Sequence, residues 1–221
     1  MGTKIKSEGK CIYCKRVIAQ KQMSKHLGQH LQDQSDSAAK NIAYHIKIEC
    51  GEMFLHVLIK GDATFKTLDA FLRSIWLECC GHLSEFDGAS MSAKFKDTAR
   101  LGGKHLYVYD MGSSTQLEIT IMGVYDIPMK DKIELLSRNE PLKIICTNCS
   151  KQPAVSICIT HIQDSENYFF CEVCAKKHEQ ECDDFSDYAN MPIVNSPRMG
   201  VCGYTGGYID KERDGTYQLK K

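Results

Sequence analysis

The sequence predicts an α+β fold: an antiparallel sheet with one packed helix, flanked by two small modules rich in cysteine and histidine. Three observations predict it. Apolar residues alternate with polar ones in two regions, as in strands. A helical repeat of apolar residues lies between those regions. Pairs of cysteine and histidine at metal-ligand spacings lie on either side of them. The order strand, strand, helix, strand, strand indicates an antiparallel sheet.

The first two strands are expected at residues 43–50 and 53–60, on either side of Gly51-Glu52. This arrangement predicts a β-hairpin. The alternating apolar positions are Tyr44, Ile46, Ile48, Leu55, Val57 and Ile59.

The helix comes next, and Thr64 or Asp62 can cap its start. Gly81 is expected to end it, and Trp76 is expected in the core. The apolar face that should pack on the sheet comprises Leu68, Leu72 or Phe71, Ile75 and Cys79.

Two more strands are expected at residues 106–109 and 117–124, with a turn at 110–114 between them. Gly112 can adopt the positive φ that such a turn needs.

The N-terminal module has the spacing Cys11-x2-Cys14-x11-His26-x3-His30, one residue short of the usual C2H2 finger. The cysteines suit a tight turn, and histidines four apart share one face of a helix, so four ligands can converge on one ion. A segment this small cannot bury enough surface to fold alone, so we expect folding and zinc binding to be one event.

The C-terminal module offers eight ligands in four close pairs. One zinc site is predicted from the first and third pairs, as in a ribbon, and a second from the remaining pairs, as in a cross-braced module. Cys158 lies in an apolar run and is alternatively a buried strand residue. The first site comprises Cys146, Cys149, Cys171 and Cys174, and the second comprises Cys158, His161, His178 and Cys182. Two or three structural zinc ions are therefore expected, because four protein ligands leave no open position for a catalytic water.

Charge is spread unevenly along a chain of 221 residues with zero net charge. Residues 1–30 hold seven basic residues and one acid, so they carry +6 and the remainder −6. This asymmetry predicts either an anionic partner or a solvated terminus. The candidate phosphate contacts are Lys15, Arg16, Lys21 and Lys25.

Five segments follow from these patterns: a finger (1–31), a linker (32–41), the α+β core (42–142), a zinc module (143–187) and a Gly/Pro-rich tail (188–221). Val194, Val201, Tyr204 and Tyr208 predict that the tail docks on the core, where Cys202 can approach Cys79 or Cys80. No apolar leader or membrane-length run is visible, so a cytoplasmic location with reduced cysteines is expected.

An enzyme is the less favoured hypothesis. The chain has no Walker loop, GxGxxG, HExxH or GxSxG motif. A cleft near His82, Asp110 and Ser113 is the alternative, although Asp110 equally suits a turn. Cys79 and Cys80 are interpreted as helix residues packed in the core rather than as a nucleophile or a further metal site.

Three segments resemble the plasmid pRiA ORF-three-like family, also described as insertion-element passenger proteins. They are residues 68–86 (LDAFLRSIWLECCGHLSEF), the strand and turn Tyr107-x-Tyr109-Asp110-Met-Gly112-Ser, and residues 195–206 (NSPRMGVCGYTG). The resemblance implies a compact α+β fold, a branch with an N-terminal finger and a cysteine-rich insert, a link to mobile elements and no established reaction. Ser113, Thr115 and Leu117 replace the family's usual Asp, Trp and His.

Together these patterns predict a zinc-binding protein that contacts nucleic acid through its basic finger. The alternative is a protein-interaction adaptor that uses the C-terminal zinc module and tail. No membrane association and no small-molecule cofactor are expected.

Overall fold

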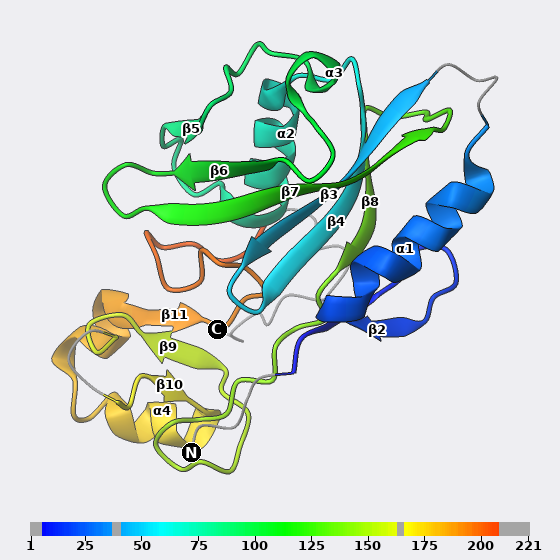
Figure 1. Ribbon diagram of the computed structural model, residues 1–221. Helices are drawn as coiled ribbons and strands as arrows, with labels where there is room; N and C mark the ends of the chain where they lie inside the picture. The colour runs from blue at the N-terminus through cyan, green and yellow to red at the C-terminus, as the bar shows by residue number, and fades with distance from the viewer. Residues whose placement is uncertain (1–5, 37–40, 163–165, 208–221) are drawn as a thin grey trace. The chain divides into compact units, whose positions relative to one another are not determined.

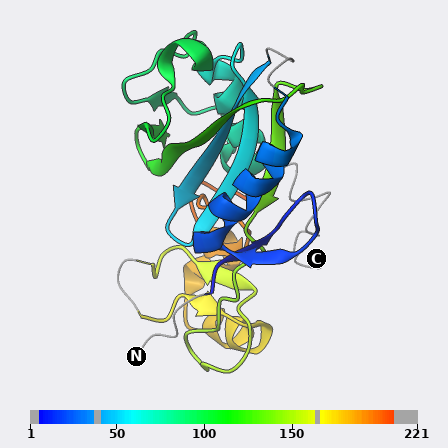
Figure 2. The same ribbon diagram turned by 45° about the vertical axis from the view of Figure 1, so that its right-hand side comes forward.

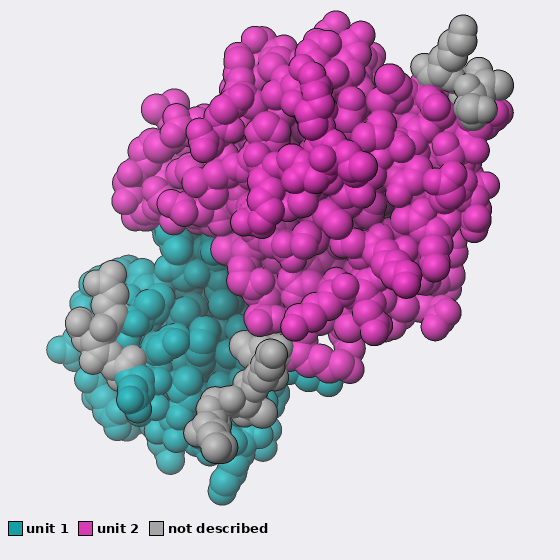
Figure 3. Space-filling model, viewed as in Figure 1, with its two compact units in different colours: residues 1–5, 74–81, 141–221 teal, residues 6–73, 82–140 magenta. Residues whose placement is uncertain are grey.

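The computed structural model describes residues 6–36, 41–162 and 166–207. It divides into two compact units (Figure 3). Unit 1 comprises residues 1–5, 74–81 and 141–221, and unit 2 comprises residues 6–73 and 82–140. The predicted finger (1–31) and core (42–142) segments thus share unit 2, except that residues 1–5, 74–81 and 141–142 belong to unit 1.

Unit 2 is built on a six-stranded antiparallel sheet with the strand order β5-β6-β7-β3-β4-β8 (Figure 1). The sheet and its packed helices confirm the α+β class. Its strands are β3 (Ile42–Cys50), β4 (Met53–Lys60), β5 (Ser84–Phe86), β6 (Lys104–Tyr109), β7 (Thr115–Asp126) and β8 (Ile133–Arg138).

The predicted hairpin is confirmed. β3 pairs with β4 in the register that places Cys50 opposite Met53. Gly51 has a φ of 58°, a left-handed conformation that glycine adopts without strain. β5 and β8, which the sequence analysis did not predict, form the two edges of the sheet.

Helix α2 (Phe65–Leu72) follows the hairpin and begins where expected. The Thr67 backbone nitrogen donates to Thr64 Oγ1 over 3.3 Å, so Thr64 is the N-cap rather than Asp62. Phe65 stacks on Phe95, from the short helix α3 (Phe95–Thr98), with 4.5 Å between ring centroids.

The helix ends earlier than predicted. It continues from α2 as a π-helical turn, η1 (Arg73–Leu77), and not to Gly81. The wider turn buries three consecutive residues, Ile75, Trp76 and Leu77, which a regular helical repeat would not bury together. Cys79 and Cys80 therefore lie beyond the helix, and Cys80 is exposed, so their interpretation as core helix residues was wrong.

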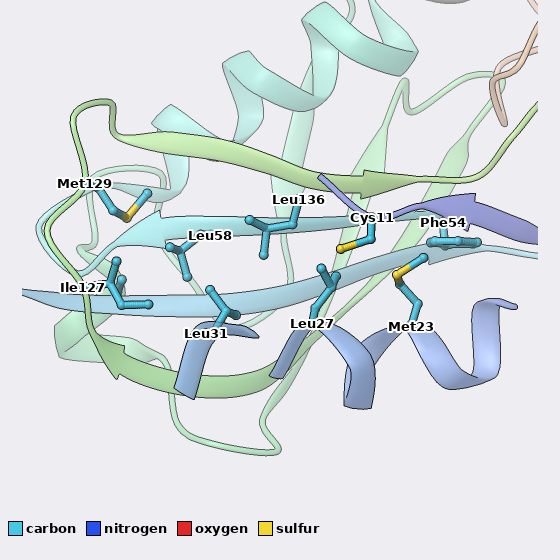
Figure 4. Packing of buried hydrophobic residues seen from close by; sticks show 10 residues of the cluster. Cys11, Met23, Leu27, Leu31, Phe54, Leu58, Ile127, Met129 and Leu136 are labelled. Carbon is cyan, nitrogen blue, oxygen red and sulfur yellow. The ribbon is translucent and has the colours of Figure 1, made fainter. Parts of the chain in front are cut away.

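One face of the sheet is covered by helix α1 (Gln20–Gln34), which lies along the strands in Figures 1 and 2. Its apolar residues Met23, Leu27 and Leu31 are fully buried and point at the sheet in Figure 4. They share a cluster with residues from strands β3, β4 and β8 and from the loop between β7 and β8: Ala43, Phe54, Leu58, Ile127, Met129 and Leu136. As a result β4 is buried on both of its faces.

A small hairpin precedes α1 and completes a ββα finger. Strand β1 (Glu8–Lys10) pairs with β2 (Val17–Ala19). The Ile12 backbone nitrogen donates to Leu136 O over 2.9 Å, which ties the finger to β8. A Cβ on Gly9 would lie 2.5 Å from Arg138 O, so this close approach requires glycine.

The turn between β6 and β7 differs from expectation in one detail. Asp110, with a φ of 67°, adopts the left-handed conformation, and Gly112 does not. Asp110 Oδ1 accepts hydrogen bonds from the backbone nitrogens of Gly112 (2.9 Å) and Ser113 (3.2 Å). This is an Asx turn, in which an aspartate tolerates positive φ.

Unit 1 contains a three-stranded antiparallel sheet in the order β10-β9-β11. Its elements are β9 (Ser156–Cys158), β10 (Phe169–Phe170), helix α4 (Glu172–His178), the π-helical turn η2 (Phe185–Ala189) and β11 (Asn190–Pro192).

The described part of the tail packs against residues 74–81, which belong to the segment predicted as core. Ser196 Oγ donates to Trp76 O over 2.6 Å. A Cβ on Gly207 would lie 2.4 Å from Ile75 O. Tyr204 is buried, whereas Tyr208 and the rest of the predicted tail lie outside the described residues.

Within the described ranges, no helix has both the length and the apolar character that a bilayer-crossing segment needs.

Candidate metal centres

The structure brings together the four predicted ligands of the finger: Cys11, Cys14, His26 and His30. The cysteines lie in the turn between β1 and β2, and the histidines lie one turn apart on α1. Cys14 Sγ lies 3.2 Å from His26 Nε2. All four ligand atoms lie within 4.8 Å of one another, a spacing that one ion can bridge.

The backbone of this turn prepares the Cys14 sulfur for a cation. Lys15 has a φ of 62°, and its nitrogen donates to Cys11 O over 3.0 Å. This conformation turns backbone N–H groups toward the sulfur, as in an anion-binding nest. The hydrogen bond from the Arg16 backbone is the largest influence on the pKa of Cys14 and lowers it. Burial lowers the pKa of His26 and keeps its imidazole neutral, as a metal ligand must be.

The first predicted cluster of the C-terminal module is also assembled. Cys146, Cys149, Cys171 and Cys174 lie within 4.8 Å of one another. Cys149 Sγ and Cys171 Sγ are 3.9 Å apart. The Thr147 backbone nitrogen donates to Phe169 O over 2.8 Å, which draws the first cysteine pair toward the second.

The turn at Cys146-x2-Cys149 repeats the finger's turn. Ser150 has a φ of 55°, and its nitrogen donates to Cys146 O over 2.9 Å. Backbone hydrogen bonds from Gln152 and Lys151 lower the pKa of Cys149 to about 6. Burial and the neighbouring thiols raise the pKa of Cys174 to about 12. Four thiolates in this space need a cation to neutralise them.

The second cluster of the module comprises Cys158, His161, His178 and Cys182. Cys158 Sγ lies 3.1 Å from His161 Nδ1. His178 is stacked on Phe170, with ring centroids 4.3 Å apart. Burial is the main cause of the lowered pKa of His178.

His178 supplies a test of whether a metal fits. Its Nε2 atom is buried and has no hydrogen-bond partner among the described residues. A buried imidazole nitrogen without a partner costs free energy unless something ligates it. The nitrogen lies in a set of two thiols and two imidazoles, a donor set that zinc favours.

The clusters are therefore paired as a cross-brace: the first and third ligand pairs form one set and the second and fourth form the other. Cys158 is both a buried strand residue at the end of β9 and a member of the second set. The two interpretations of Cys158 were thus compatible.

The four predicted phosphate contacts lie on the finger, and all are exposed. Lys15 and Arg16 are in the turn after Cys14, and Lys21 and Lys25 are on the first half of α1. Gln22, Gln29 and Gln32 are exposed on the same helix.

The candidate enzymatic residues are also close together. His82 Nδ1 lies 3.5 Å from Asp110 Oδ1, the oxygen that forms the Asx turn with Gly112 and Ser113. The His82 ring meets the Tyr109 ring edge to face, with centroids 5.7 Å apart. The hydrogen bonds of Asp110 to Gly112 and Ser113 explain its presence here as a turn residue.

Sequence reasoning set one further group aside as a metal site: Cys79, Cys80, His82 and Cys202, whose ligand atoms also lie within 4.8 Å of one another. The expected approach of Cys202 to Cys80 is confirmed, with 3.4 Å between their sulfurs. The adjacent cysteines followed by His82 were visible in the sequence. Cys202 follows Cys80 by 122 residues, so no local spacing links them.

The comparisons with known proteins identify no family. No family model matches the chain. No curated protein matches it either. One solved structure, a protein of unknown function from Methanosarcina mazei Go1, is similar at 20% identity with a TM-score of 0.37, over 44% of this chain and 67% of that chain.

Proposed function

We propose that this protein is a zinc-dependent binding protein whose finger contacts nucleic acid. In this proposal zinc fills the three predicted ligand sets and has a structural role in each. The sets are closed, with four protein ligands apiece, and contain only thiols and imidazoles. Membership of the pRiA ORF-three-like family and its link to mobile elements remain proposals drawn from the sequence.

The observation that carries the nucleic-acid proposal is the two-sided character of α1. One side, with Met23, Leu27 and Leu31, is buried on the sheet. The exposed residues include lysines and glutamines, and the helix has no acidic residue before Asp33. Lysine and arginine bind phosphate, and glutamine amides can bind either phosphates or base edges.

Packing on the sheet also favours binding by a single finger. A single finger contacts only about three base pairs, so it gains little binding free energy to offset the cost of becoming ordered. Because α1 is already held against β4 and β8, its exposed side is fixed before a ligand arrives. Less conformational entropy is then lost on binding.

Fluorescence anisotropy with short single- and double-stranded DNA and RNA tests this proposal. The charge variant is Lys15→Gln, Arg16→Gln, Lys21→Gln, Lys25→Gln. Its matched control removes four exposed basic residues elsewhere in unit 2: Lys66→Gln, Lys94→Gln, Lys96→Gln, Arg100→Gln.

We expect the wild type and the control to bind with steep salt dependence and the finger variant to bind weakly. For duplex DNA, removing one basic side chain that neutralises a phosphate should reduce the slope of log K against log salt by about 0.9. Absence of binding at low salt, or equal weakening in both variants, would overturn the proposal.

A second candidate function, a protein-interaction adaptor, is favoured by exposed apolar side chains on the zinc module. Val173 on α4 is 63% exposed and Tyr188 on η2 is 56% exposed. Ile145 and Ile162 are exposed as well. A partner bound there should survive high salt and be lost with Val173→Asp, Tyr188→Asp, whereas binding that salt removes would contradict this function.

A further inference from the structure

Three thiols meet where the helix formed by α2 and η1 has ended. Cys79 and Cys80 follow η1, and Cys202 comes from the tail. Cys80 Sγ lies 3.9 Å from Cys79 Sγ and 3.4 Å from Cys202 Sγ. His82 follows Cys80 by two residues, and the ligand atoms of all four lie within 4.8 Å of one another.

These separations are close to those of ligands on one tetrahedral ion. Two sulfurs bound to zinc at about 2.3 Å are about 3.8 Å apart when the geometry is tetrahedral. The Cys149 and Cys171 sulfurs, in a set predicted from sequence spacing, are 3.9 Å apart. The separation of the Cys79 and Cys80 sulfurs therefore equals one in a set identified independently, and that of the Cys80 and Cys202 sulfurs is 0.5 Å shorter.

A buried cation lies beside the group. Arg198 is fully buried, and its Nη2 lies 3.7 Å from Cys79 Sγ. Three thiolates, a neutral imidazole and a divalent zinc ion sum to one negative charge. A guanidinium next to a sulfur offsets that charge, and a buried arginine needs such an anionic neighbour.

The tail's backbone is bent to present Cys202. Cys202 has a φ of 52°, between Gly200 at 74° and Gly203 at 66°. A left-handed conformation is strained for a residue other than glycine. It persists where the surroundings enforce it. Upstream, Ser196 is bonded to Trp76 and also accepts from the Arg198 nitrogen over 2.9 Å, which positions the turn.

We propose that Cys79, Cys80, His82 and Cys202 bind a fourth zinc ion, which fastens the tail to the segment that follows the helix. A disulfide between Cys80 and Cys202 would use only two of the four groups, whereas one ion can bind all four. Cys80 and Cys202 are exposed, unlike the cysteines of the first module set, most of which are buried. This fourth ion should therefore exchange with solution faster than the ions of the other sets.

The test is to count zinc per chain in the full-length protein by native mass spectrometry and elemental analysis. The variant is Cys80→Ser, Cys202→Ser. The control is Cys50→Ser, because Cys50 belongs to no ligand set among the described residues. Circular dichroism reports whether each protein is folded.

We expect the double variant to hold one zinc fewer than the wild type, and the control to match the wild type. Equal counts in the variant and wild type would overturn the fourth site, whatever the total. A wild-type mass two hydrogens lower, with no fourth ion, would overturn it in favour of a disulfide.

Cobalt(II) loading keeps the proposal falsifiable if the double variant fails to fold. Thiolate-to-cobalt charge-transfer absorption rises with each Cys-ligated ion. Titration of the wild type should show a last equivalent that is lost first to a competing chelator. If no such weakly held equivalent of cobalt were bound, the proposed fourth site would be wrong. His26→Ala, Cys171→Ser and Cys182→Ser each remove one ligand from a different predicted set, so failure of those sets is distinguishable from failure of the fourth site.

Discussion

At the scale of single residues, the sheet of unit 2 contains a buried pair of histidines. His45 on β3 and His56 on β4 are 1% and 0% exposed, and His45 Nε2 lies 2.9 Å from His56 Nδ1. They occupy polar positions of the alternation that predicted the hairpin. They are buried because α1 covers their face of the sheet, for which the sequence indicated no covering element. One ring must donate and the other accept, so the two rings cannot both be protonated.

This pair should make the stability of unit 2 depend on pH. Burial lowers the pKa of His45 to about 4, and burial, His45 and Lys47 lower that of His56 well below 6.5. The unfolded chain therefore binds protons first, and the free energy of unfolding should fall as the pH drops from about 6.5 toward 4. His45 alone would contribute about 3 kcal/mol of this fall. Urea unfolding followed by circular dichroism at several pH values measures it.

The matched variant for this prediction is His45→Gln, His56→Gln. Saturating zinc is kept in both proteins, so that acid release from the finger affects each alike. The variant should be less stable at pH 7 but show a flatter pH profile between about 6.5 and 4. Parallel profiles would mean that the pair does not titrate in this window.

At the scale of elements, α1 belongs to two structures at once. It supplies His26 and His30 to the finger and covers one face of the sheet with Met23, Leu27 and Leu31. Both duties fit because histidines four apart and apolar residues four apart form adjacent stripes of one helix. The ligand stripe was predicted from spacing. The apolar stripe was visible, but nothing local says what it packs against.

Replacing Leu27 with alanine should weaken the packing of α1 on the sheet without removing a metal ligand. Leu27 is fully buried between α1 and the sheet, so Leu27→Ala should reduce the free energy of unfolding by about 2–5 kcal/mol. Alanine favours helix, so the reduction would come from packing. Urea unfolding by circular dichroism measures it. Gln29→Ala, on the exposed side of the same helix, should change stability by less than about 0.5 kcal/mol. Equal effects would contradict the packing of α1.

The elements that sequence patterns missed share a physical cause. β5 has three residues, too few to show alternation. β8 buries its last three residues in succession, so it lacks a two-residue period. The π-helical turn η1 breaks the helical repeat at Arg73, which is why the helix was expected to continue to Gly81. Long, regular elements such as β4 and β7 were predicted, although β7 extends past the expected residues 117–124.

At the scale of the molecule, the ligand sets differ in how far the sequence could define them. Each cysteine or histidine pair within the three predicted sets is joined by two or three intervening residues, and regular pairing suggested the cross-brace. The fourth group depends on a tail that returns to the helix over 122 residues. Its ligands come together only through tertiary contacts such as Ser196 with Trp76.

The two units also differ in what their cores are made of. The cluster of the C-terminal module has eight buried residues, of which five are ligand cysteines. The cluster beneath α1 in unit 2 has ten, of which only Cys11 is a ligand. Only Phe170, Phe185 and Ala189 in the module's cluster are not metal ligands. Its folding free energy should therefore be mostly zinc-binding free energy.

Removing zinc should thus unfold the module while the sheet of unit 2 stays folded. Cys171→Ser should have the same local effect, because it removes one ligand of the first module set and leaves three thiols without a full complement. Hydrogen exchange measures both cases. Amides of β9, β10 and α4 should lose protection, whereas those of β3, β4 and β7 should keep it. Cys50→Ser, treated identically, should leave both regions protected. If β9 and α4 stayed protected in Cys171→Ser, the module would have a core independent of its metal and the ribbon assignment would be wrong.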